Sequence, residues 1–98
     1  MTTHTIATDR PINRLAVDIA EEIIRLGIAP TDYLAAYLLP LFCITDLSQA
    51  YGYDSAAGIA GYCVDALESQ AGWRGPRAKC LVTELDGRVR HFYREALA

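Results

Sequence analysis

The stretch "GWRGPRAKCLVTELDGRVRHFYRE", residues 72–95, decides the fold, because two different structures fit it. If it forms strands, residues 79–94 make two arms around Asp86-Gly87, a dipeptide typical of a type I′ hairpin turn. If it forms a helix, the apolar side chains from Val89 onward recur at helical spacing. We predict the hairpin. The alternative is an all-α chain.

The same stretch makes the chain electrically asymmetric. The 98 residues carry 9 Lys and Arg against 12 Asp and Glu, a formal net charge of −3. Residues 71–98 contribute +3 to this total and residues 1–70 contribute −6. Such polarity is typical of a solvated face, and it also suits a partner with charged patches of its own. Candidate residues for binding nucleic acid or a partner are the basic side chains of this region and two aromatic neighbours: Trp73, Arg74, Arg77, Lys79, Arg88, Arg90, Phe92 and Arg94.

Composition bounds the class of protein. A hydrophobic fraction of 52% with 21% charged residues excludes a disordered chain, and the length fits one domain. We expect a flexible N-terminus over residues 1–9, a helical core over 10–70 and the basic hairpin over 72–95. Apolar runs fall short of the about 20 residues that a membrane span needs. The N-terminus lacks the features of a signal peptide, so we predict a cytoplasmic location.

The core should contain about four helices. The first is predicted over residues 10–26, where Asp9 caps the start and Gly27 ends the helix. The second begins at Thr31 and ends near Leu39, because Pro40 cannot continue a helix. A short helix should run from Thr45 or Asp46 to Gly52, and a fourth from Asp54 or Ser55 to about Gln70. The fold class is therefore mostly α with a C-terminal β-hairpin.

This order of elements resembles winged-helix domains. The segment "ITDLSQAYGYDSAAGIAGYCVDALES", residues 44–69, looks like their helix-turn-helix, with Gly52 at the turn and Leu47 as a core anchor. The segment "LVTELDGRVRHFYRE", residues 81–95, looks like the wing. The resemblance implies a DNA-binding transcriptional regulator. The chain departs from the pattern because the helix that would enter the major groove lacks the Arg and Lys that read bases and neutralise phosphates.

Enzymatic chemistry has no sequence signature in this chain. The sequence contains no Gly-rich phosphate loop, metal-ligand cluster or nucleophile elbow. We therefore predict no catalysis, cofactor or metal. The three cysteines, Cys43, Cys63 and Cys80, lie in apolar contexts without knuckle spacing and are expected to be buried, reduced thiols.

Six tyrosines in 98 residues favour a protein interface, because tyrosine combines a large contact area with a polar tip. The candidate protein-binding residues are acids off the apolar helix stripes and two tyrosines: Asp18, Glu21, Glu22, Asp65, Glu68, Tyr33 and Tyr37. We predict a non-catalytic module that blocks or tethers another protein, such as a nucleic-acid-binding protein with a basic groove. Phage and mobile-element inhibitors, including anti-CRISPR proteins, are often of this size and acidity. The apolar second helix also predicts a homodimer.

Overall fold

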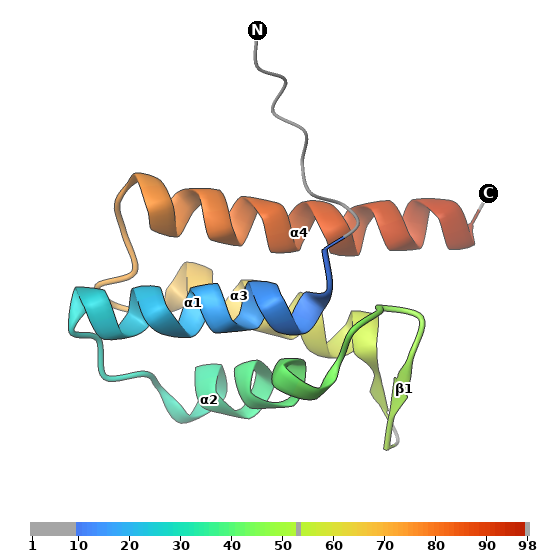
Figure 1. Ribbon diagram of the computed structural model, residues 1–98, viewed down its shortest axis with the longest axis horizontal. Helices are drawn as coiled ribbons and strands as arrows, with labels where there is room; N and C mark the ends of the chain where they lie inside the picture. Colours follow the sequence, from blue (N-terminus) through green and yellow to red (C-terminus); the bar gives the residue numbers. More distant parts are fainter. Residues whose placement is uncertain (1–9, 53, 98) are drawn as a thin grey trace, which may run out of the picture.

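The computed structural model describes residues 10–52 and 54–97 and shows a mostly helical chain with one small sheet (Figure 1). Its elements are α1 (Ile12–Leu26), α2 (Asp32–Leu38), the 3₁₀ helix η1 (Leu39–Cys43), β1 (Ala50–Tyr51), β2 (Asp54–Ser55), α3 (Ala56–Ser69) and α4 (Pro76–Ala96). Helix α4 packs on α1 and α3, α2 packs on α3, and η1 packs on α1. As a result, α2 and α4 lie on opposite sides of the molecule. None of the described helices has the length and apolar character needed to cross a membrane.

Helix α1 follows the sequence pattern closely. Its apolar stripe is buried, including Ile12, Leu15 and Ile19. The helix ends at Gly27, whose φ of 68° is left-handed and whose N–H bonds to carbonyls of the last turn. Its N-cap position is Pro11, and the predicted cap Asp9 lies outside the described residues.

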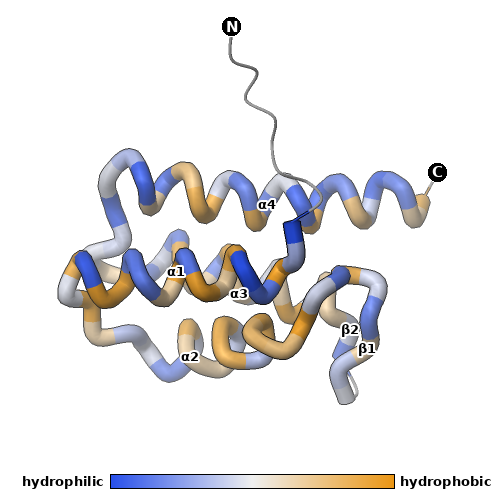
Figure 2. The backbone as a smooth tube through the Cα atoms, viewed as in Figure 1, coloured by the Kyte–Doolittle hydropathy of each residue, from blue (hydrophilic) through white to orange (hydrophobic). Residues whose placement is uncertain are grey.

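Helix α2 begins and ends where the sequence predicts. The Thr31 hydroxyl accepts a hydrogen bond from the Leu34 N–H at 3.1 Å, which caps the first turn. The helix stops at Leu38, and the chain then tightens into η1, which contains Pro40. Figure 2 shows this stretch as hydrophobic along most of its length, and it supplies Leu34 and Leu41 to the core.

The prediction of a short helix from Asp46 to Gly52 is wrong. Ala50 pairs with Ser55 across a two-stranded hairpin that turns at Gly52, where φ is 63°. Before the hairpin, the Gln49 side-chain oxygen accepts hydrogen bonds from the N–H groups of Thr45 and Asp46. These contacts give two backbone N–H groups of the segment before β1 a hydrogen-bond partner.

Helix α3 starts at the predicted cap. The Ser55 hydroxyl accepts from the Gly58 N–H at 2.9 Å, and Ile59, Cys63 and Leu67 point into the core. Burial raises the pKa of the Cys63 thiol to about 12. The prediction of buried thiols is wrong for Cys43 and Cys80, which are exposed.

The prediction of a hairpin over residues 79–94 is also wrong. The whole segment lies in α4, a helix of 21 residues. Ala78, Leu81, Leu85 and Val89 recur three or four positions apart and are all buried, so they form one stripe against α1 and α3. The helical alternative is therefore correct for this segment. The described residues contain only the small β1–β2 sheet.

Candidate protein interface

Helices α2 and α3 bring three tyrosine rings into contact. Tyr33 and Tyr37 lie one turn apart on α2, with ring centroids 5.3 Å apart in an edge-to-face arrangement. Tyr62 reaches Tyr37 from α3, with centroids 5.0 Å apart. Tyr33 and Tyr62 remain 41% and 52% exposed, whereas Tyr37, which contacts both, is half-buried. The stack therefore presents aromatic surface whose positions are already fixed by neighbouring rings.

The surroundings of the stack are acidic. Asp65 is exposed one turn after Tyr62 on α3. Partial burial raises the pKa of the Tyr33 hydroxyl, and the negative charge of Asp65 raises it further. The sequence has five acids and no Lys, Arg or His between Arg25 and Arg74. We call Tyr33, Tyr37, Tyr62 and Asp65 the tyrosine–acid face.

The acids predicted on α1 are placed differently. Asp18 is half-buried in an ion pair with Arg10, at 2.7 Å, and Arg10 also bonds Glu84 of α4 at 2.6 and 2.9 Å. These contacts raise the pKa of Arg10, most strongly through the hydrogen bond to Glu84. Glu21 is exposed. Asp18 is therefore held in an internal contact.

The prediction that Glu22 lies on the exposed side of α1 is wrong. Its side chain is only 1% exposed. The carboxylate accepts hydrogen bonds from both Arg25 Nε, at 2.8 Å, and Arg25 Nη2, and Arg77 Nε lies 3.6 Å away. The first turn of α4 supplies Arg77 here, and the position of that turn could not be predicted from a local pattern.

The predicted basic patch is divided among several places. Arg77 faces Glu22, Arg88 donates to the Arg10 carbonyl at 2.8 Å, and Arg90 pairs with Asp86 at 2.8 Å. Arg94 is exposed near the end of α4. Phe92 is half-buried against the core and, with Arg88, lines a pocket of about 290 Å³.

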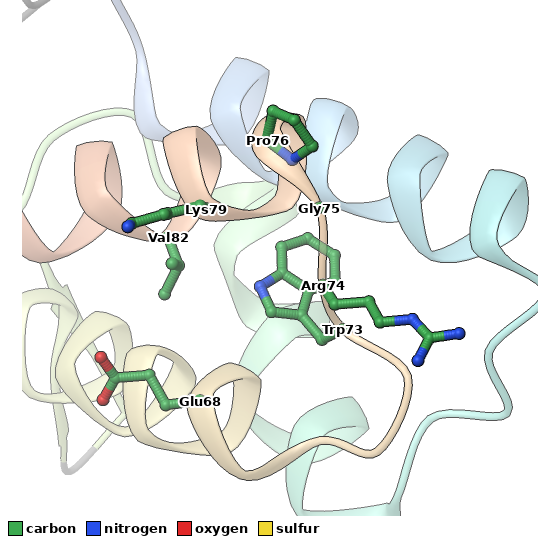
Figure 3. Close-up of a pocket in the computed structure, with 7 residues that line it drawn as sticks. All are labelled: Glu68, Trp73, Arg74, Gly75, Pro76, Lys79 and Val82. Atoms are coloured by element: carbon green, nitrogen blue, oxygen red, sulfur yellow. The ribbon is translucent and has the colours of Figure 1, made fainter.

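The remaining candidates of this segment lie together. Trp73, Arg74 and Lys79 line an open pocket of about 610 Å³ between the end of α3 and the start of α4 (Figure 3). We call it the Trp73 pocket, and its lining residues are Glu68, Trp73, Arg74, Gly75, Pro76, Lys79 and Val82.

Sequence reasoning missed Tyr62 as a site residue. Tyr62 precedes the buried Cys63 and follows Gly61, so nothing local distinguishes it from a tyrosine at the edge of the core. Its role becomes visible only when α3 is packed on α2. In residues 10–52 and 54–97, no three His, Cys, Asp or Glu side chains are grouped as metal ligands would be.

No protein-family model, curated protein sequence or solved structure matches this chain.

Proposed function

We propose that this protein is a small non-catalytic binding module of the cytoplasm that blocks or tethers another protein through the tyrosine–acid face. The observation that carries the proposal is the stack of Tyr33, Tyr37 and Tyr62 beside exposed carboxylates, on a part of the chain without basic residues. Exposed aromatic surface of this kind is enriched in protein interfaces.

The physical chemistry of the face indicates its partner. Tyrosine rings that are already fixed lose little conformational entropy on binding, which makes them suitable as interface hot spots. Carboxylates around them favour a basic partner and increase the rate of association. A basic groove that normally holds nucleic acid has the required charge. An inhibitor of the phage or mobile-element type, such as an anti-CRISPR protein, is the form of this function that fits a chain of 98 residues with a net charge of −3.

The test uses the partner captured from the native host and measures binding kinetics with purified variants. Tyr62→Ala should weaken binding at least about tenfold, because it removes an exposed ring of the stack. The matched control is Tyr93→Ala, since Tyr93 is 44% exposed on α4, outside the face. Equal affinities for the two variants would contradict the proposal.

A charge reversal tests the acidic part of the face. Asp65→Lys should slow association and reduce its dependence on salt, whereas Glu21→Lys, an exposed reversal on α1, should change the rate much less. If both reversals slow association equally, the net negative charge of the protein sets the association rate, and the tyrosine–acid face has no specific role in it.

The alternative function is a DNA-binding transcriptional regulator of the winged-helix kind, although the predicted wing, residues 81–95, lies in α4. It would place α3 in the major groove, although α3 carries Asp65 and Glu68 and no Lys or Arg. A mobility-shift titration of the full chain at low salt, with single- and double-stranded DNA, tests it. A complex with DNA would favour the regulator, and no complex would remove it.

A further inference from the structure

The Trp73 pocket differs from the tyrosine–acid face in position and charge. It lies where α3 and α4 converge, and Glu68 is the one residue of its lining that carries a negative charge. Glu68 and Tyr62 are six residues apart on α3, about 240° around the helix, so they face different neighbours. Two separate surfaces of one small protein are therefore available to partners.

The walls of the Trp73 pocket are mainly apolar. The indole of Trp73, the ring of Pro76 and the side chain of Val82 surround it (Figure 3). Its volume of about 610 Å³ falls in the range of sites that accept a large side chain or a small ligand. An occupant with an apolar group would cover these walls.

The charges at the rim favour an anionic occupant. Lys79 lies on one side of Trp73 and Arg74 extends to the other side, with Glu68 across from Lys79 (Figure 3). The adjacent N-terminus of α4 has no acidic residue in its first turn and no side-chain cap. The partial positive charge of this helix end therefore adds to that of the two cations.

Trp73 supplies an independent indication of a ligand. Its Nε1 is buried and has no hydrogen-bond partner among the described residues. Figure 3 shows this nitrogen on the side of the indole that faces Lys79, Val82 and Glu68. An unpaired buried N–H destabilises the free protein, and an occupant that shifts the atoms covering this nitrogen and brings a carbonyl or carboxylate oxygen would satisfy it.

We propose that the Trp73 pocket binds a short acidic segment of a partner protein, with an apolar side chain against Trp73 and Val82 and a carboxylate beside Lys79. A nucleic acid fits less well, because Lys79 and Arg74 extend to opposite sides of the indole and do not form one row of cations along a continuous phosphate chain. The proposal goes beyond the proposed function, since it assigns a second docking site of opposite sign.

The test uses Trp73 as its own reporter, because it is the single tryptophan of the chain. End-blocked pentapeptides with a central leucine or phenylalanine between glutamates are titrated into the full chain, and matched peptides carry lysines in place of the glutamates. We expect a saturable change of tryptophan emission with the acidic peptides alone, and an affinity that falls as salt rises. No saturable change with any acidic peptide at millimolar concentration would overturn the proposal.

Variants of α4 locate the binding. Lys79→Glu should lower the affinity for the acidic peptides at least about fivefold. Arg94→Glu, an exposed reversal near the other end of the helix, should leave this affinity unchanged. Circular dichroism checks that both variants remain helical. Equal affinities for Lys79→Glu and the unaltered chain would overturn the proposal.

Two further titrations separate other occupants. A saturable, Lys79-dependent emission change with single-stranded DNA would overturn the proposal in favour of a nucleic-acid site. The same change on raising the protein concentration alone would overturn it in favour of a second copy of this chain. Tyr62→Ala should bind the acidic peptides as the unaltered chain does, so a failure of this site is distinguishable from a failure of the tyrosine–acid face.

Discussion

Glu22 is a buried carboxylate that joins two helices. Arg25 approaches it from the next turn of α1, and Arg77 approaches it from the first turn of α4. A buried carboxylate is tolerated when opposite charges and hydrogen bonds replace its water, and here two guanidinium groups do so. Glu22 therefore helps to fix the start of α4 against α1.

This arrangement predicts how stability depends on pH. Hydrogen bonds from Arg25 are the largest cause of the lowered pKa of Glu22 in the folded protein. The stabilisation is present above the ordinary glutamate pKa of about 4.3 and is lost as the pH falls through the lowered value. Glu22→Gln should thus be less stable than the unaltered chain at pH 7, and its stability should depend less on pH in this acidic range.

Urea unfolding at a series of pH values measures the effect. Glu21→Gln is the matched control, since Glu21 is exposed, and its profile should follow that of the unaltered chain. Parallel profiles for Glu22→Gln and the unaltered chain would show that the Glu22 carboxylate has the same pKa in the folded and unfolded states.

At the residue scale, local contacts were predictable and distant ones were not. The caps Thr31 and Ser55 were predicted because their partners lie three residues away. The burial of Glu22 and the place of Tyr62 in the stack depend on residues of other helices, which no local spacing specifies.

Helix α4 is the element that local sequence describes least well. The Asp86-Gly87 dipeptide and the alternating side chains around it are compatible with a hairpin. The helix places its buried stripe against both α1 and α3, so tertiary packing decides between the two structures. The short β1–β2 hairpin was missed although it is local, because Gly52, at its turn, was predicted as the end of a helix.

The substitution Gly87→Ala distinguishes a helix from a hairpin in this segment. In α4, Gly87 does not have a positive φ, and an added Cβ meets no atom within 4 Å. Alanine should therefore raise the free energy of unfolding by about 1 kcal/mol, because glycine is unfavourable inside a helix. In a type I′ turn the same change would be destabilising.

Thermal unfolding measures this change. The matched control is Gly52→Ala in the β1–β2 turn, where the space is also open but φ is 63°. The free energy of unfolding of that variant should be lower by about 1 kcal/mol or more, because the left-handed conformation is unfavourable for alanine. A lower unfolding temperature for Gly87→Ala would contradict the helix.

On the scale of the whole molecule, charge follows the arrangement of helices. The acidic α2 and α3 carry the tyrosine–acid face, and the basic α4 lies on the side opposite α2. The sequence predicted this asymmetry from residue counts. It did not predict that Arg77 and Arg88 would bond within the protein, since their partners Glu22 and Arg10 lie in distant segments that the fold brings close.

The homodimer remains a prediction at this scale. Much of the apolar second helix is core, but Leu39 of η1 is 63% exposed. Light scattering should give a mass of about twice the 10.8 kDa of one chain, and Leu39→Asp should lower it. A mass near 10.8 kDa at high concentration would show that this apolar edge does not form a homodimer.

The contact between Arg10 and Glu84 has a consequence for the order of folding, because it joins residues 74 positions apart. Closing so long a loop is entropically unfavourable until the intervening helices are in place, so this contact should form after the rate-limiting step. Arg10→Ala should then lower the free energy of unfolding by about 1 kcal/mol. This loss should appear as an unfolding rate about fivefold higher, with the refolding rate nearly unchanged. Stopped-flow measurements across denaturant concentrations test this, and a slowed refolding limb would mean that the two ends of the chain meet early.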